Sequence, residues 1–335
     1  MTRNQVGIVG AGEIAEVGHL PVYSSHSSID VVAVADLNRE RAKTVANDYG
    51  ISHIYEDGQS LIDQEPLDAI SICTPPSTHR EFFISAAERG MDIFCEKPFA
   101  LSVQDAERMH QAASQNDITT SIGYSPRYLR NYKKVASYVN TGLLGEPLEG
   151  SVRCIVPPPS TSWRYDPDVS GGGIITDMAP HWFDFYLELF ETVPEVKDVN
   201  LNNIHTSDVE DYGSFELSFG DVDIDMTFRW MKSGMTSKAI RENKLVAEEG
   251  NVQFDRDYLE GNITGNGVRF KRGKAPVLSL GPLLNVYPRV NESSHQKAVS
   301  EFVEYLSKGT GDIVGSKRGL EVSRIKSRIY NGADL

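Results

Sequence analysis

Two short segments carry residues with the chemistry of a catalytic site. An apolar run ends at Glu96-Lys97-Pro98, so a carboxylate and a lysine ammonium follow directly after a predicted strand, Asp92 to Cys95. Asp177 and His181 are four residues apart, and on a helix they share a face where the carboxylate can orient or charge-stabilise the imidazole. Such groups can stabilise an alkoxide and take up a proton. Each segment also has a structural interpretation: an exposed ion pair at a strand end, and a capping aspartate beside an incidental histidine.

The beginning of the chain carries a glycine motif that is typical of dinucleotide binding. A predicted strand, Val6 to Val9, runs into G-x-G-x-x-A and then into helical apolar spacing. Gly10 permits the tight turn, Gly12 lets the backbone approach a pyrophosphate, and Ala15 keeps helix and strand close. The helix N-terminus adds N–H donors and the positive end of its dipole. The predicted cofactor contacts in this turn are Gly10, Gly12, Glu13 and Ile14.

An aspartate follows the second predicted strand, Val31 to Ala35. At this distance from the glycine motif, the Asp36 carboxylate is placed to accept hydrogen bonds from the ribose hydroxyls of a dinucleotide. Its charge would repel a 2′-phosphate, so the sequence favours NAD over NADP. Arg39 and Arg41 lie close enough to keep NADP open.

Strands and helices continue to alternate, which predicts a doubly wound parallel sheet. The strand from Leu67 to Ile72 ends in a proline-rich loop that reaches His79. This loop belongs to the same carboxyl edge of the sheet as the glycine turn, where open α/β sheets bind ligands. Thr74, Pro75 and His79 are therefore candidate cofactor contacts, although a histidine in the first turn of a helix is also commonly structural.

The second half of the chain has a different pattern. Three segments alternate apolar and polar residues like antiparallel strands covered on one face: 150–156, 214–219 and 223–230. We expect a Rossmann domain over residues 1–124. The remainder, 125–335, is predicted to be an α+β domain with a large, mostly antiparallel open sheet, and its last helix (about 318–330) to pack back on the body. Arg127, at the junction, is either a surface charge or a substrate contact.

Three consecutive glycines precede the Asp177–His181 pair. Gly171 to Gly173 allow close backbone approach or unusual dihedral angles, and a helix is predicted to start near Asp177, with Pro180 tolerated in its first turn. No third nitrogen or sulfur ligand is spaced nearby, so we predict no metal site.

Composition narrows the class of protein further. The 335 residues carry a formal charge of −14, which disfavours nucleic-acid and anionic-membrane partners. Cys73, Cys95 and Cys154 have no CxxC spacing and cannot all pair within one chain, which indicates buried, reduced thiols in a cytoplasmic protein. No apolar run approaches the roughly 20 residues of a membrane-spanning helix.

In their order and spacing, these motifs resemble the glucose-fructose oxidoreductase/inositol dehydrogenase/MocA family. The resemblance rests on GAGEIA, Asp36, TPPSTH, EKP, the junction at 124–128 and GGGIITDMAPHWFD, and is dense from residue 5 to about 190. It implies an N-terminal Rossmann domain and a C-terminal domain whose open sheet often forms the oligomer interface, hence a homodimer or homotetramer. Most members use NAD or NADP to oxidise a hydroxyl of a sugar, inositol or related polyol, or to reduce the ketone. One departure is Ala179, where the family usually has glycine.

The resemblance also assigns roles. It makes Lys97, Asp177 and His181 the catalytic residues and places Glu96 near the nicotinamide ribose. It further implies a turn at Pro98, in the cis form, that directs Lys97. We hypothesise that His181, positioned by Asp177, removes the hydroxyl proton while Lys97 stabilises the alkoxide, with the exchanged roles left open.

Two loop residues are further candidate contacts. Arg164 could bind a carboxylate or phosphate of the substrate, or the cofactor pyrophosphate, and Tyr287 could contact the substrate.

Two other functions remain open for such a chain. One is an NAD-dependent glycoside hydrolase that works by transient oxidation, and the other is a dinucleotide-binding sensor without turnover. The intact Lys97, Asp177 and His181 argue against the sensor.

Overall fold

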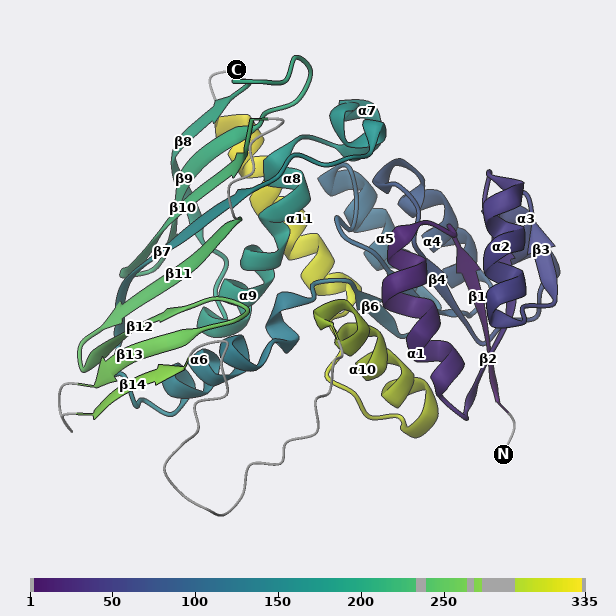
Figure 1. Ribbon diagram of the computed structural model, residues 1–335, viewed down its shortest axis with the longest axis horizontal. Helices are drawn as coiled ribbons and strands as arrows, with labels where there is room; N and C mark the ends of the chain where they lie inside the picture. The colour runs from purple at the N-terminus through teal and green to yellow at the C-terminus, as the bar shows by residue number, and fades with distance from the viewer. Residues whose placement is uncertain (1–2, 233–238, 264–267, 273–292, 333–335) are drawn as a thin grey trace. The chain divides into compact units, whose positions relative to one another are not determined.

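The computed structural model describes residues 3–232, 239–263, 268–272 and 293–332 (Figure 1). The chain forms two compact units. The first contains Met1–Ser125, Asp166–Gly171 and Ser293–Ser327, and the second contains Pro126–Tyr165, Gly172–Glu292 and Arg328–Leu335.

The first unit is built on a parallel sheet of six strands in the order β3-β2-β1-β4-β5-β6. The strands are β1 (Asn4–Val9), β2 (Ile29–Ala35), β3 (His53–Tyr55), β4 (Ala69–Ile72), β5 (Asp92–Cys95) and β6 (Thr120–Ile122). The strand order reverses between β1 and β4, the kind of switch point at which doubly wound sheets bind ligands. The predicted Rossmann-type sheet is confirmed.

Most helices of this unit alternate with its strands, and two more come from later parts of the chain. They are η1 (Ala15–His19), α1 (Leu20–Ser25), α2 (Arg39–Tyr49), α3 (Gly58–Gln64), η2 (Pro76–Thr78), α4 (His79–Glu88), α5 (Val103–Gln115), α7 (Pro167–Ser170) and α10 (Ser294–Lys308). α11 (Ser316–Gly332) begins here, and its last residues belong to the second unit.

Local sequence explains where these helices begin and end. Asn38 caps α2 by accepting a hydrogen bond from the Arg41 N–H, and α2 ends at Gly50 in the left-handed conformation. Ser102 caps α5 in the same way through the Asp105 N–H. These caps fix both ends of α2 and the beginning of α5.

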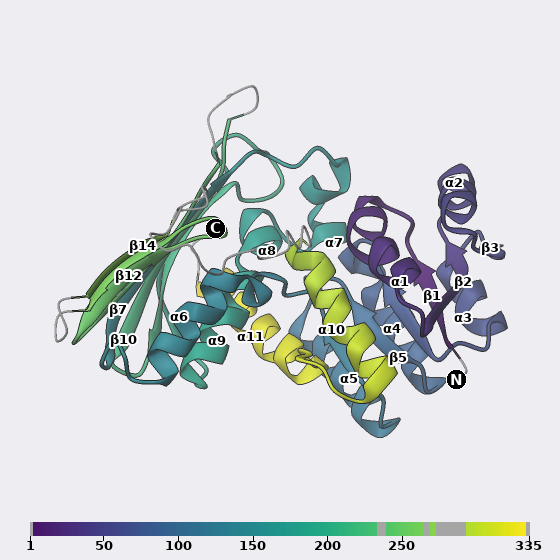
Figure 2. The ribbon, with the colours of Figure 1, turned by 60° about the horizontal axis from the view of Figure 1, so that its bottom comes forward.

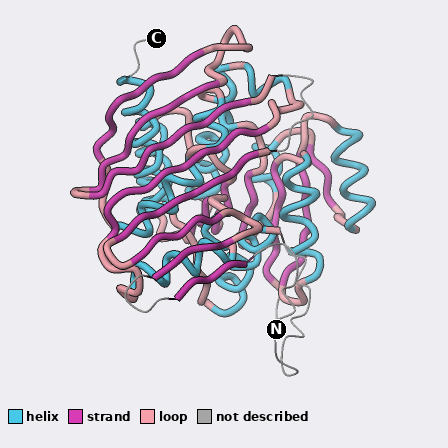
Figure 3. The backbone as a smooth tube through the Cα atoms, turned by 60° about the vertical axis from the view of Figure 1, so that its left-hand side comes forward, coloured by secondary structure: helices cyan, strands magenta, loops and turns pink. Residues whose placement is uncertain are grey.

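The second unit contains an eight-stranded sheet in the order β14-β13-β12-β11-β7-β10-β9-β8 (Figure 3). The strands are β7 (Pro147–Val156), β8 (Glu195–Asn202), β9 (Tyr212–Phe219), β10 (Val222–Trp230), β11 (Ile240–Ala247), β12 (Gly250–Phe254), β13 (Leu259–Ile263) and β14 (Val268–Arg272). β7 and β10 pair in parallel and the other pairs are antiparallel, so the predicted mostly antiparallel sheet is confirmed.

Helices of the second unit lie along one side of this sheet (Figure 2). They are α6 (Arg130–Asn140), α8 (Ile174–Met178) and α9 (Pro180–Phe190), with the short turns η3 (Pro126–Tyr128) and η4 (Ser162–Tyr165). The aromatic rings of α9 fill the space between helices and sheet: Trp182 packs edge-on against Phe228, and Phe185 against Tyr132. The aromatic residues around His181 are therefore part of the core of this unit.

One helix boundary differs from the prediction. Helical structure begins at Ile174, three residues before Asp177, and a second helix begins at Pro180. Pro180 has no N–H to continue the hydrogen bonding of α8, so the two helices meet at Ala179. Asp177 and His181 therefore lie on successive short helices rather than on one.

The three cysteines are buried and free, as predicted. Burial raises the pKa of the Cys73 and Cys95 thiols, which makes them poor nucleophiles.

Among the helices in the described ranges, none combines the length and apolarity needed to cross a membrane.

Candidate active site

The glycine turn joins β1 to the first helix at the carboxyl edge of the parallel sheet. Gly10 has φ +94°, and a Cβ there would lie 2.8 Å from the Cys73 carbonyl, so only glycine fits. At Gly12, by contrast, an added Cβ would meet no atom within 4 Å. That open space over a helix N-terminus fits a pyrophosphate that approaches the backbone closely.

Asp36, at the end of β2, is tied to the glycine turn. Its Oδ2 accepts the Ala11 N–H at 2.8 Å and its Oδ1 accepts the Asn38 N–H at 2.7 Å. A carboxylate has about four acceptor sites, so both oxygens keep capacity for ribose hydroxyls. Arg41 lies beside it, with Nη1 3.6 Å from Oδ2, whereas Arg39 pairs with Glu56. The arrangement fits the predicted ribose contact and keeps one arginine within reach of a 2′-phosphate.

The proline-rich loop after β4 is held by His79. The imidazole is fully buried, with Nε2 2.9 Å from the Thr74 carbonyl and Nδ1 3.0 Å from the Pro98 carbonyl. Burial lowers the pKa of His79, although the two carbonyls favour the charged form. His79 therefore joins the Thr74–Pro75 loop to the Glu96–Pro98 turn, and we interpret it as a residue that positions both.

The Lys97–Pro98 peptide bond is cis, as predicted. Lys97 is half-buried at the end of β5. The neighbouring Glu96 is buried, and its Oε1 lies 3.0 Å from Nε2 of His19. Burial opposes the charge of Glu96, but the hydrogen bond from His19 and the positive charges nearby outweigh it and hold the pKa of this carboxyl below its usual value. Sequence reasoning missed His19, although a histidine on the apolar face of the first helix was a signal.

The glycine run positions α8 in the second unit. Gly171 and Gly172 have φ of +76° and +136°. A Cβ on Gly172 would lie 2.0 Å from the Tyr330 hydroxyl, and one on Gly173 would lie 1.9 Å from the Glu210 carbonyl oxygen. The predicted close backbone approach is therefore confirmed.

A buried glutamate takes advantage of this approach. The Glu210 carboxylate accepts the N–H groups of Gly173, at 2.9 and 3.0 Å, and of Ile175, at 3.0 Å, and the Tyr330 hydroxyl donates to it at 2.7 Å. Burial raises the pKa of Glu210, against the effect of these hydrogen bonds. Glu210 caps the helix that carries Asp177, and nothing local in the sequence pointed to it, because it lies 37 residues after Gly173.

Asp177 and Arg164 form an ion pair within the second unit. Arg164 Nε lies 3.5 Å from Asp177 Oδ1, and the guanidinium packs over the Trp163 ring at 4.4 Å. His181 is buried in the first turn of α9. The structure thus brings Arg164 to Asp177, and the orientation of His181 by Asp177 stays a prediction.

Arg127 is held by acidic residues of α9. Its Nη1 lies 3.0 Å from Asp184 Oδ1 and its Nη2 2.5 Å from Glu188 Oε2. Burial opposes its charge, but the two carboxylates outweigh burial and raise the pKa of Arg127. This geometry favours a structural role for Arg127, in which it holds α9 in place. It disfavours the predicted contact with substrate. Tyr287 lies outside the described residues.

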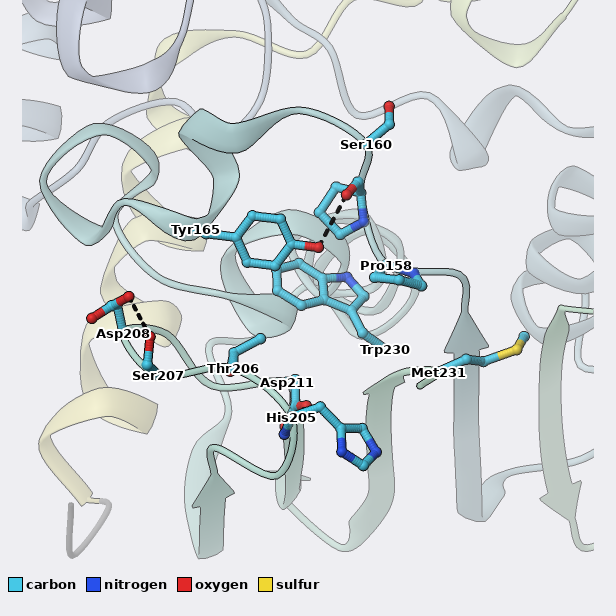
Figure 4. Close-up of a pocket in the computed structure, with 11 residues that line it drawn as sticks. Pro158, Ser160, Tyr165, His205, Thr206, Ser207, Asp208, Asp211, Trp230 and Met231 are labelled. Carbon is cyan, nitrogen blue, oxygen red and sulfur yellow. Dashed lines mark hydrogen bonds between the residues drawn. The ribbon is translucent and has the colours of Figure 1, made fainter. Parts of the chain in front are cut away.

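A pocket of about 530 Å³ opens at one end of the second unit's sheet (Figure 4). Tyr165 and Trp230 pack edge to face in it, with ring centroids 5.5 Å apart. The Tyr165 hydroxyl donates to the Pro159 carbonyl, and the Asp211 carboxylate accepts the N–H groups of Ile204 and His205. These polar groups hold the loops of the pocket together, and we assign no ligand to it.

The six-stranded parallel sheet, its glycine turn and Asp36 define a dinucleotide-binding protein of the Rossmann class. Residues 4–124 match the model of the oxidoreductase family with an NAD-binding Rossmann fold, and residues 132–241 match the GFO/IDH/MocA C-terminal domain. The chain therefore belongs to the Gfo/Idh/MocA family of oxidoreductases.

Individual relatives agree with this assignment. The chain is 29% identical to a myo-inositol 2-dehydrogenase of Thermotoga maritima over 232 residues, 69% of this chain and 66% of the relative. It is 22% identical to a D-glucoside 3-dehydrogenase of Escherichia coli over 353 aligned positions, 98% of this chain and 95% of the relative. Among solved structures, a levoglucosan dehydrogenase in complex with NADH and levoglucosan has the same fold, with a TM-score of 0.84 at 21% identity, covering 98% of this chain and 97% of that one.

Proposed function

We propose that the protein is an NAD-dependent dehydrogenase that acts on a hydroxyl group of a sugar, inositol or related polyol, or on the corresponding ketone. The observation that carries the proposal is the carboxyl edge of the parallel sheet. There the open space at Gly12, the Asp36 carboxylate and Lys97 follow the ends of β1, β2 and β5. The names of the relatives, which include inositol and glucoside dehydrogenases, support the substrate class.

The residues of the chain divide the chemistry between them. Gly10, Gly12 and Asp36 would hold the dinucleotide, and the bound nicotinamide supplies the hydride acceptor or donor. His181 takes the hydroxyl proton as the alcohol is oxidised. The Lys97 ammonium donates a hydrogen bond to the developing alkoxide. Asp177 would orient His181, and it also pairs with Arg164.

A substrate panel tests the proposal. The purified protein, supplied with NAD and a set of sugars and polyols that includes myo-inositol and D-glucose, should produce NADH, followed by absorbance at 340 nm. Release of nitrophenol from a nitrophenyl glycoside without net NADH would instead identify an NAD-dependent glycoside hydrolase. Tight NADH binding without either reaction would identify a sensor. A homodimer or homotetramer, expected from the family resemblance, stays a prediction.

The Asp36 carboxylate should set the preference for NAD. The variant Asp36→Ser removes the charge that repels a 2′-phosphate. Arg41, which lies 3.6 Å from the Asp36 carboxylate in the wild type, is then available to bind one. We expect the ratio of kcat/KM for NADP to that for NAD to rise by about tenfold or more, equivalent to about 1.4 kcal/mol. The double variant D36S/R41Q should lose this gain. An unchanged ratio in Asp36→Ser would contradict the assignment of Asp36 to the ribose.

A further inference from the structure

A buried chain of polar side chains leads to the turn that carries Lys97. His19 is fully buried at the end of η1, a π-helical turn that follows the glycine motif. Its Nε2 lies 3.0 Å from Glu96 Oε1 and its Nδ1 lies 3.1 Å from the Ser71 hydroxyl. The Tyr23 hydroxyl lies 2.7 Å from the same Ser71 oxygen. π-Helical turns inside helices are frequent at functional sites, and this one turns a histidine into the core.

One assignment of hydrogens satisfies the whole chain with a neutral imidazole. Tyr23 donates to Ser71, Ser71 donates to Nδ1 of His19, and Nε2–H of His19 donates to Glu96. Burial, opposed by the hydrogen bond with Ser71, raises the pKa of Tyr23, so its hydroxyl stays protonated and able to donate. All donors therefore run in one direction and end at the Glu96 carboxylate.

The Glu96 carboxylate in turn fixes the backbone at Lys97. Its Oε2 accepts the Lys97 N–H at 3.3 Å. The same oxygen lies 2.7 Å from the position of a Cβ on Gly123, so the side chain packs directly against the backbone at the end of β6. His19 on one side and Gly123 on the other leave the carboxylate little freedom to move.

We propose that His19 is a positioning residue for Lys97: it holds the Glu96 carboxylate, which holds the backbone from which Lys97 extends. The inference rests on the proposed function, because the catalytic role of Lys97 is part of that function. The ammonium must be placed accurately against a developing alkoxide, and misplacement by about 1 Å can cost on the order of a hundredfold in rate.

The same arrangement has a consequence for pH. Several titratable groups interact with Glu96: His19, Tyr23, His79, Lys97, His295 of α10 and the thiols of Cys73 and Cys95. Because the pKa of Glu96 is held below its usual value, the carboxylate is ionised at neutral pH, and its contribution is lost as pH falls through that pKa. Without the hydrogen bond from His19, burial is less opposed and the loss should occur at a higher pH.

Two amide variants separate the two nitrogens of His19. In His19→Gln the side-chain amide can occupy the position of Nε2 and still donate to Glu96. In His19→Asn the amide can occupy the position of Nδ1, keeps a partner in Ser71 and is too short for Glu96. Tyr23→Phe removes one buried hydrogen bond of the chain without touching Glu96 and serves as the matched control for stability.

The measurements are kcat and KM against pH with the best substrate of the panel, NADH affinity by fluorescence, and the unfolding temperature against pH. We expect His19→Asn to lose about ten- to a hundredfold in kcat, with an acidic limb at higher pH and NADH affinity little changed. We expect His19→Gln to stay within about threefold of wild type. Tyr23→Phe should unfold at a lower temperature with the wild-type pH profile.

Equal kcat and pH profiles in His19→Asn and His19→Gln would overturn the proposal. If His19→Asn does not fold, His19→Gln decides alone, since a folded glutamine variant with less than a tenth of the wild-type kcat also overturns it. If the wild type oxidises no compound of the panel, the proposed function fails instead. The pH dependence of unfolding then still tests whether His19 holds Glu96. The pH at the midpoint of acid destabilisation should be higher in His19→Asn than in His19→Gln.

Discussion

Replacing Lys97 by methionine should lower kcat by about 10²- to 10⁴-fold while NADH affinity stays near wild type. Methionine keeps an unbranched apolar side chain and removes the ammonium, so the variant isolates the charge. Lys97 is half-buried at the end of β5, beside a carboxylate whose position is fixed. A group that stabilises the transition state alone should change kcat and kcat/KM equally and leave KM unchanged.

A surface lysine provides the matched control for this result. Lys43 pairs with Glu40 on the exposed side of α2, and such pairs contribute little to stability, so Lys43→Met should keep wild-type kinetics and unfolding temperature. Steady-state kinetics with the best panel substrate and NADH fluorescence titration measure both variants. Turnover of Lys97→Met near the wild-type rate would remove Lys97 from the mechanism.

The first unit could be predicted closely because its signals are local. The glycine motif, Asp36 and the prolines after β4 each specify a turn or strand end within a few residues. Parallel strands joined by helices then place these ends at one edge of the sheet without further information. The resemblance to the family added the cis peptide bond at Pro98, which no local pattern specifies.

The parts that escaped prediction depend on contacts between distant residues. Gly172 and Gly173 indicated a close neighbour, but the neighbours are distant in sequence. Glu210 lies 37 residues after Gly173, and Tyr330 lies 154 residues after its partner Thr176. The contact between His19 and Glu96 spans 77 residues and depends on the π-helical turn. The break at Ala179 was within reach of the sequence, because Pro180 cannot extend the hydrogen bonding of a helix that begins at Ile174.

Gly173 joins Glu210 to α8, and Gly173→Ala should have the largest effect on stability. The added Cβ would lie 1.9 Å from the Glu210 carbonyl oxygen and 2.8 and 3.0 Å from its carbonyl carbon and nitrogen, all backbone atoms that cannot move independently. Relieving the clash must separate α8 from Glu210 and break the hydrogen bonds from the N–H groups of Gly173 and Ile175. Overpacking and the loss of buried hydrogen bonds together should cost about 3 kcal/mol or more.

The unfolding temperature measures this cost. At roughly 2 to 4 °C per kcal/mol for a unit of this size, Gly173→Ala should unfold about 6 to 12 °C below wild type. It should also lose activity, because α8 carries Asp177. Gly12→Ala is the matched control: its Cβ meets no protein atom within 4 Å, so it should unfold at the wild-type temperature and bind NADH more weakly. If Gly173→Ala unfolds at the wild-type temperature, Glu210 does not hold α8. The glycine run would then have to be explained by the backbone conformations of Gly171 and Gly172 alone.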